Sequence, residues 1–124
     1  MTIRTTANSR AAKAKGAVHE KHVADFYKAN GFPHAERKAK RGQFDAGDIT
    51  GVVALTVEVK SWAAYRPTLW LKELEVERQN NGTEYGVVHF KLAGSTKAPV
   101  LINEDMWAKI LAIPGVKEAF DGTA

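Results

Sequence analysis

Cysteine is absent from the 124 residues of this chain. This absence excludes a disulfide framework, thiol-based catalysis and any zinc or iron–sulfur site held by cysteine. Histidine is scarce as well: the chain has four histidines, and no two of them have the spacing His-x-x-x-His. Asp and Glu remain as the main metal ligands, so an oxygen-rich site for a hard cation such as Mg²⁺ is expected rather than a zinc site.

Long apolar runs are also missing. No stretch approaches the length of a membrane span, and residues 1–15 are polar, Ala-rich and basic, unlike a secretory signal. We therefore expect a cytoplasmic protein with no membrane partner and no organic cofactor. The length and a hydrophobic content of 44% predict one domain over residues 1–124, with a basic arm at 1–15 and a weakly held tail at 114–124.

Acidic residues are few at the N-terminal end. Through Arg41 the chain carries ten Lys and Arg against three acids, a net charge of +7, while the whole chain has +4. Such a basic segment is typical of proteins that bind nucleic acid, although a basic surface that only aids solubility explains the charge equally well. The candidate DNA-binding residues are Lys13, Lys15, Arg37, Lys38, Lys40, Arg41 and Lys91.

Hydrophobic periodicity predicts a mixed α/β fold. The expected elements are a helix from Asn8 or Ser9 to about Asn30, strands at 34–38, from Ile49, and at 55–60, a helix at 68–81, strands at 85–92 and 99–102, and a helix at 104–111. The order α-β-β-β-α-β, followed by a short β-α, predicts a mixed β-sheet with helices on both faces.

One spacing stands out: Asp48 is followed nine residues later by Glu58-Val59-Lys60. Alternation along a strand puts Glu58 and Lys60 on one face. If residues 52–54 form a three-residue hairpin loop, Asp48 lies opposite Glu58 on the neighbouring strand, and two such close carboxylates favour a divalent cation between them. A slip of one residue would turn Asp48 away.

Two further residues complete this candidate site. The Lys60 ammonium could orient a metal-bound water and stabilise charge on an attacked phosphate. Glu20 lies on the same side of its predicted helix as Gly16, Val23 and Tyr27, so its carboxylate faces inward. The simpler interpretation is that Asp48 caps a turn, that Glu58 and Lys60 form a surface ion pair, and that Glu20 faces solvent.

In this order and spacing, the residues resemble the PD-(D/E)XK nuclease superfamily and, more narrowly, the small Holliday junction resolvases of phages and prophages. The segments that carry the resemblance are His19-Glu20, residues 30–37, residues 45–49, residues 57–60, Trp70-Leu71 with Glu73 and Glu75, and residues 85–88. Gly47 stands where the family's motif has proline before the first Asp, and Asp45 is a rival for the role of Asp48.

The resemblance implies a restriction-endonuclease-like fold and phosphodiester hydrolysis in DNA. It implies Asp48, Glu58 and the Val59 carbonyl as ligands of Mg²⁺, or of Mn²⁺ in its place. Lys60 would act on the attacking water, and Glu20 would be the supporting acid. It further implies a homodimer that cuts four-way junctions, in the cytoplasm of the host if a phage encodes it. Flaps, single strands or plain duplex remain alternative substrates, and a DNA-binding module without catalysis remains an alternative function.

Overall fold

Nine helices and strands follow one another along the described part of the computed structural model, which covers residues 6–38, 47–60, 64–92 and 94–124, with side chains from residue 16 onward. They are α1 (Thr6–Ala29), β1 (Glu36–Arg37), β2 (Ile49–Thr50), β3 (Leu55–Lys60), α2 (Pro67–Asn81), β4 (Tyr85–Phe90), β5 (Val100–Leu101), α3 (Glu104–Leu111) and α4 (Val116–Asp121). No helix in these residues is long and apolar enough to cross a bilayer.

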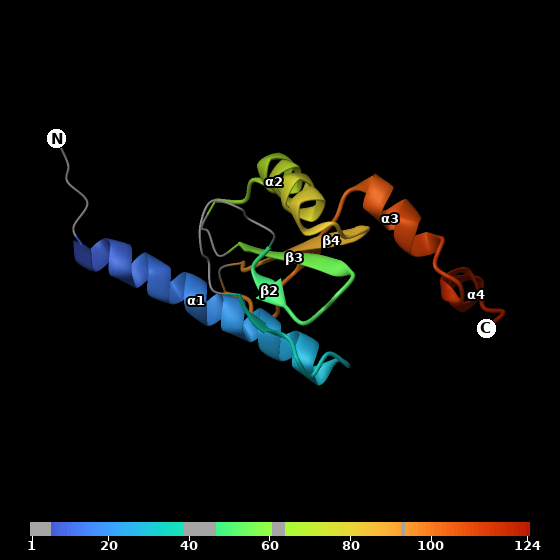
Figure 1. Ribbon diagram of the computed structural model, residues 1–124, viewed down its shortest axis with the longest axis horizontal. Helices are drawn as coiled ribbons and strands as arrows, with labels where there is room; N and C mark the ends of the chain where they lie inside the picture. Colours follow the sequence, from blue (N-terminus) through green and yellow to red (C-terminus); the bar gives the residue numbers. More distant parts are fainter. Residues whose placement is uncertain (1–5, 39–46, 61–63, 93) are drawn as a thin grey trace.

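The strands form a mixed layer between α1 and α2 (Figure 1). Strands β3 and β4 are parallel, from Leu55 opposite Tyr85 to Lys60 opposite Phe90, and helix α2 is the crossover between them. Strand β5 pairs with β4 in the antiparallel sense, and β1 pairs with β2 likewise. The mixed α/β architecture predicted from the sequence is therefore confirmed.

Alternation along β3 decides which helix each side chain meets. Val57 and Val59 belong to a buried cluster with Val23, Ala24 and Tyr27 of α1. The other face turns to α2, where Lys60 reaches Glu73 and Thr56 reaches Asn81. Glu58 has the same parity as Thr56 and Lys60, so its side chain belongs to the α2 face.

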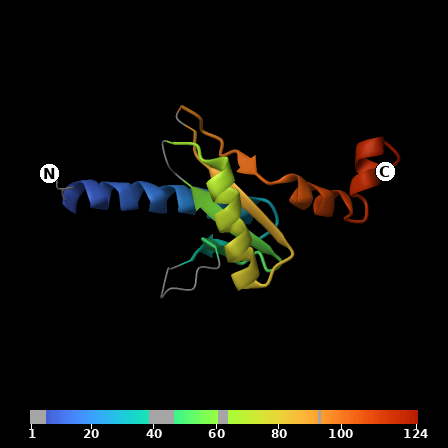
Figure 2. The same cartoon turned by 90° about the horizontal axis from the view of Figure 1, so that it is seen from above.

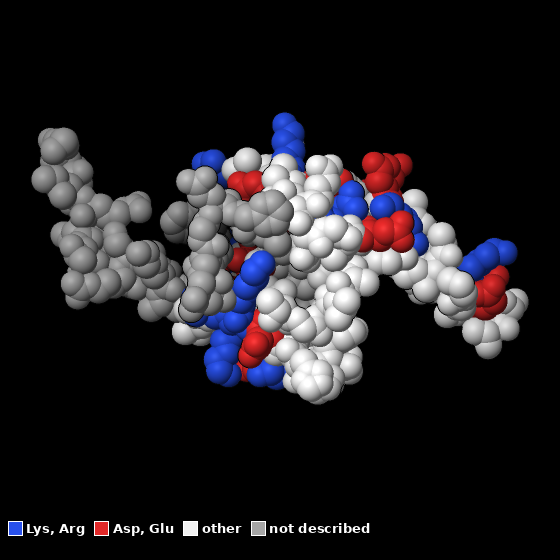
Figure 3. All heavy atoms as spheres, viewed as in Figure 1, with Lys and Arg blue, Asp and Glu red and all other residues white. Residues whose placement is uncertain are grey.

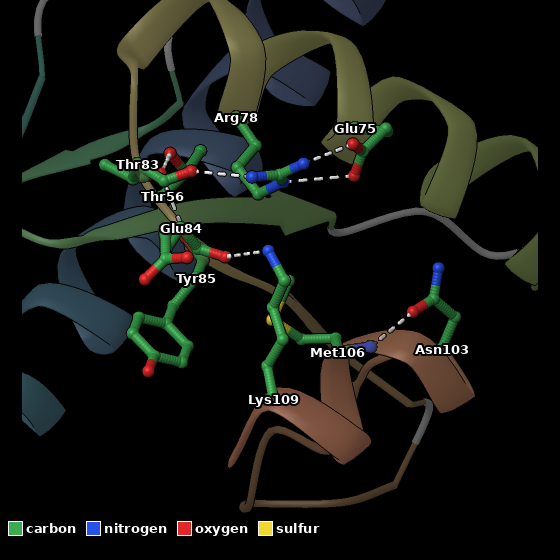
Figure 4. A network of polar contacts seen from close by, with 9 residues as sticks. All are labelled: Thr56, Glu75, Arg78, Thr83, Glu84, Tyr85, Asn103, Met106 and Lys109. Atoms are coloured by element: carbon green, nitrogen blue, oxygen red, sulfur yellow. Dashed lines mark hydrogen bonds and ion pairs between the residues drawn. The ribbon is translucent and has the colours of Figure 1, made fainter. Parts of the chain in front are cut away.

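Local stop signals explain the ends of α2. Pro67 starts the helix, and Gly82 ends it with a φ of 72°, a left-handed conformation that glycine adopts without steric cost. The predicted start at residue 68 is thus one residue late. Beyond Gly82, Arg78 donates to the Thr83 carbonyl and pairs with Glu75, which fastens the helix end to the next strand (Figure 4).

The C-terminal helices extend away from the strands, on the side opposite the N-terminal end of α1 (Figure 2). Asn103 caps α3 by accepting a hydrogen bond from the Met106 amide at 2.9 Å (Figure 4). Where the sequence predicted a weakly held tail after residue 114, the structure has helix α4. The rings of Trp107 and Phe120 are in tilted contact between α3 and α4, with centroids 5.9 Å apart, a contact that local sequence patterns did not reveal.

An uncharged groove lies between the body and α3. Its volume is about 570 Å³, and its lining residues are Phe32, Gly51–Leu55, Tyr85–Val87, Met106, Ile110 and Ile113. In the space-filling view an uncharged stretch likewise separates the end of α1 from α3 (Figure 3).

Basic and acidic side chains lie side by side on α1 itself, where Lys21 and Lys28 both pair with Asp25.

Candidate functional site

Glu58 and Lys60 lie together on the α2 face of β3, as the alternation predicts. The Lys60 ammonium is 4.0 Å from Glu58 Oε1 and is in direct contact with Glu73 Oε2. The Glu58 side chain is only 3% exposed, whereas that of Lys60 is 21% exposed. A buried carboxylate of this kind carries a high desolvation cost unless a cation or a proton compensates it.

Asp48 lies at the free edge of β3, immediately before β2. Its amide donates to the Val57 carbonyl, and its carboxylate oxygen Oδ2 accepts from the Val59 amide, both at 2.8 Å. These two hydrogen bonds are made to Val57 and Val59, the residues on either side of Glu58 in β3. Asp48 is only 1% exposed. The structure therefore brings Asp48 against the backbone of the strand that carries Glu58 and Lys60.

Glu20 lies in a different layer. It is on α1, which covers the Val57 and Val59 face of β3, and its Oε2 accepts from Arg37 Nε at 2.6 Å. Because Glu58 belongs to the α2 face, the structure does not bring Glu20 beside it. Among the residues that the structure describes, no three His, Asp or Glu side chains converge closely enough to hold a metal ion.

Helix α2 contributes acids that the sequence analysis gave no role. Glu73 contacts Lys60, and Glu77 is 5% exposed on the buried side of the helix. Their spacing of four residues next to the apolar positions Trp70 and Leu74 was the available signal, because residues four apart share one helix face. Without the packing of α2 on β3, that signal could not be assigned to this site.

The candidate DNA-binding residues are placed unevenly. Arg37 is tied to Glu20, Lys38 is half-buried and Lys91 is exposed. Lys13 and Lys15 belong to α1, but their side chains lie outside the described residues, as do Lys40, Arg41 and the rival acid Asp45 entirely.

A second polar cluster lies between α1 and β4. His89 is 3% exposed, and its Nε2 lies 2.6 Å from the Tyr27 hydroxyl. Burial first, and then the nearby His19 and His22, lower the pKa of His89 to about 4. Burial also raises the pKa of Tyr27. Helix α1 covers the His89 ring, because the rings of Phe26 and Tyr27 both contact it.

His19 is 5% exposed, and its pKa is also lowered. Burial lowers its pKa, with His22 and Lys91 adding to the effect. Its Nε2 has no hydrogen-bond partner within the described ranges. The lowered pKa values of His19 and His89 favour their neutral forms, which suits packing between layers more than binding to phosphate.

Comparison with known proteins found no matching family model, no matching curated protein and no matching solved structure. The function is therefore inferred from the residues and their geometry.

Proposed function

We propose that this chain is a divalent-metal-dependent nuclease that hydrolyses phosphodiester bonds in DNA. The observation that carries the proposal is the grouping on β3: buried Glu58 lies 4.0 Å from Lys60, and buried Asp48 is hydrogen-bonded to the residue between them. Carboxylate oxygens are the ligands that Mg²⁺ and Mn²⁺ prefer. An ammonium at the same place suits a substrate whose reacting group is an anionic phosphate.

The residues present fit such a cation. Glu58 Oε2 is buried and has no hydrogen-bond partner in the described part of the chain, as expected of an oxygen whose partner is a metal ion. Asp48, Glu58 and the Val59 carbonyl would hold the ion. When bound, it would polarise the phosphate and make a water more acidic.

Lys60 would then act at the phosphate. In the structure its ammonium contacts Glu73 and lies near Glu58, and the Lys60 side chain is partly exposed. The ammonium therefore lies between the buried Glu58 carboxylate and solvent. A water activated there could attack in line with the leaving oxygen, while the ammonium stabilises the negative charge that develops on the phosphate oxygens. Because this charge is greatest in the transition state, Lys60 would raise the rate more than it raises substrate affinity.

DNA is the proposed substrate because the basic residues are concentrated in the N-terminal third of the chain. The excess of basic residues before Arg41 favours a polyanion, and the resemblance to junction resolvases favours a four-way junction. The proposal includes the restriction-endonuclease-like topology and a homodimer, since paired cuts across a junction need two active sites. Light scattering of the chain with and without junction DNA would test the dimer.

The deciding experiment is cleavage of end-labelled DNA. With Mg²⁺, the wild-type protein should make two paired nicks in each four-way junction. The substitutions Asp48→Asn and Glu58→Gln should each abolish cleavage. Asp25→Asn, which changes an exposed acid of α1, is the matched control and should cleave normally. Flap, single-stranded and duplex DNA at the same salt concentration would define the substrate. Intact junction under both Mg²⁺ and Mn²⁺ would overturn the proposal.

A DNA-binding module without catalysis is the second candidate. It is favoured by the ion pairing of Lys60 with Glu73, and by the lack of three converging ligands among the described residues. In that case Asp48→Asn would leave DNA binding unchanged or strengthen it, and Mn²⁺ would not raise the melting temperature. Metal-dependent stabilisation that Asp48→Asn removes would instead favour the nuclease.

A further inference from the structure

The C-terminal arm, made of helices α3 and α4, extends away from the strands and carries apolar side chains on two faces (Figure 2). On the first face Met106 is buried and Ile110 lines the uncharged groove. Trp107 and Leu111, which are four residues apart and so share the next face of α3, are both partly exposed. Phe120 of α4 contacts Trp107 and is still 64% exposed. The arm therefore has a second apolar face, which does not line the groove.

Helix α4 itself has little to hold it. It spans six residues, Val116–Asp121, and none of them is buried. Isolated helices shorter than about 12 residues are only marginally stable in water. The ring contact between Trp107 and Phe120 ties α4 to α3. A surface that covered these two rings would therefore stabilise α4 where it lies.

The uncharged groove offers an apolar surface of this kind. It has a volume of about 570 Å³, and none of its lining residues is charged. It includes the turn Gly51–Ala54, in which Val53 is 93% exposed, and the first residues of β3 and β4, Leu55 and Tyr85. Pockets of about 300–1,000 Å³ bury whole drug-sized ligands, so the groove has room for a few large side chains. One chain thus carries both an exposed apolar arm and an open apolar groove.

The distribution of charge indicates what could meet the arm. Residues 104–124 contain four acids and two lysines, a net charge of −2, whereas the whole chain has +4, so residues 1–103 carry +6. An acidic arm repels nucleic acid, and Trp107 and Phe120 are therefore poorly placed to stack on DNA bases. The same arm is attracted to a basic protein surface. The body of a second copy of this chain has that charge.

We propose that the arm and the groove form an interface with a second copy of this chain, in which Trp107 and Phe120 of each copy lie in the groove of the other, next to Val53. A two-fold arrangement uses the same two surfaces on both copies and covers both at once. Aromatic residues and a lack of charge are typical of the centre of protein interfaces. The inference names the interface of the proposed homodimer, so it rests on that part of the proposed function but not on DNA cleavage.

Such an interface leaves the proposed nuclease site at a distance. Strands β3 and β4 are parallel, and the groove includes their first residues, Leu55 and Tyr85, while Lys60 is the last residue of β3. Five residue steps along a strand span about 17 Å. Lys60 of each copy would therefore lie at the end of β3 that is away from the second copy.

Sedimentation equilibrium of the full chain without DNA tests the interface. The wild-type chain should show a monomer–dimer equilibrium. Phe120→Asp and Val53→Asp should each raise the dimer Kd at least about 100-fold, because each would bury an unpaired charge in an apolar contact. Val76→Asp is the matched control, since Val76 is 58% exposed on α2 and does not line the groove. It should dimerise as wild type does.

Cross-linking covers the case in which an aspartate variant fails to fold. Because the chain has no cysteine, a copy with one introduced cysteine can be cross-linked only to another copy. A mixture of Val53→Cys and Phe120→Cys copies, treated with a short bismaleimide, should give more cross-linked dimer than either variant alone. A mixture of Val76→Cys and Phe120→Cys copies should give no such excess.

Three results would overturn the inference: a chain that stays monomeric at about 1 mM, a dimer that both aspartate variants leave intact, or equal cross-linking in the two mixtures. These outcomes are separate from cleavage. If DNA is not cleaved but Phe120→Asp and Val53→Asp abolish the dimer, the interface stands and the nuclease does not. If the wild-type chain cleaves DNA and both variants stay dimeric, the nuclease stands and this interface does not.

Discussion

The Tyr27 hydroxyl and His89 Nε2 lie 2.6 Å apart in the buried layer between α1 and β4, although 62 residues separate them in the chain. Their rings also meet edge to face, with centroids 5.3 Å apart. This contact ties the basic N-terminal helix to the strand next to β3. It therefore contributes to the packing that holds the α1 layer against the face opposite Glu58.

Tyr27→Phe should destabilise the fold. The substitution keeps the ring but leaves His89 Nε2 buried without its partner, which costs about 1–3 kcal/mol. Urea unfolding followed by circular dichroism would measure the loss. Tyr65→Phe, at a side chain that is half exposed, is the control and should stay within about 0.5 kcal/mol of wild type. Equal stability of the two variants would contradict the role of the bond.

Stability should fall as the pH falls from 6.5 towards 4. His89 has its folded pKa lowered to about 4, so the folded state favours the neutral ring. The stabilisation is complete above the unfolded pKa near 6.5 and is lost as protons bind, about 3 kcal/mol in full. His89→Gln can still bond to Tyr27 but does not titrate, so its unfolding free energy should change less over this range. Parallel pH profiles for both proteins would exclude His89 as the source.

Thr56→Val should loosen the end of α2 from β3. The Thr56 hydroxyl is fully buried, lies 2.6 Å from the Thr83 hydroxyl and accepts from Asn81 (Figure 4 shows Thr56 beside Thr83). Valine leaves these polar groups unpaired at a cost of about 1–3 kcal/mol. Hydrogen exchange of α2 amides and urea unfolding would report it. Thr50→Val, on exposed β2 surface, should change stability by less than about 0.5 kcal/mol.

Gly51→Ala should be far more harmful than Gly115→Ala, although φ is +88° and +92° at the two positions. A Cβ atom at Gly51 would be 2.2 Å from the His34 carbonyl oxygen, while at Gly115 nothing lies within 4 Å. Gly115→Ala should cost about 1–2 kcal/mol for the left-handed backbone. Gly51→Ala adds a backbone clash, on the order of 4 kcal/mol or more in all. Similar melting temperatures for the two variants would argue against this close approach of the β1 and β2 segments.

Lys60→Ala should separate binding from catalysis. We expect it to keep Mn²⁺ and junction binding but to cut junction DNA at least about 100-fold more slowly, because the ammonium acts on charge that develops in the transition state. Single-turnover cleavage with saturating protein would measure the rate. Lys72→Ala removes an exposed lysine of α2 and should cleave as wild type does. Full activity of Lys60→Ala would remove Lys60 from the mechanism.

Where the local pattern was strong, the sequence predicted the elements closely. The bounds expected for β3 and α3, residues 55–60 and 104–111, are those of the structure. Alternating apolar residues predicted the strand, and the structure shows that Asn103 caps the start of the helix. Where the pattern was weak, the predicted strands were too long. The strand predicted at 34–38 is Glu36–Arg37 in the structure, and the one predicted at 99–102 is Val100–Leu101. Strand ends depend on pairing partners, which a local pattern does not contain.

The sequence by itself determined that Glu58 and Lys60 share a face of one strand, because strand alternation is a property of the backbone. Only the tertiary structure decided which helix covers that face. Glu20 and Glu77 are both acids on inward helix faces, yet α1 packs on Val57 and Val59 while α2 packs on Thr56 and Lys60. That choice arises from contacts between residues far apart in the chain, and no local periodicity encodes it.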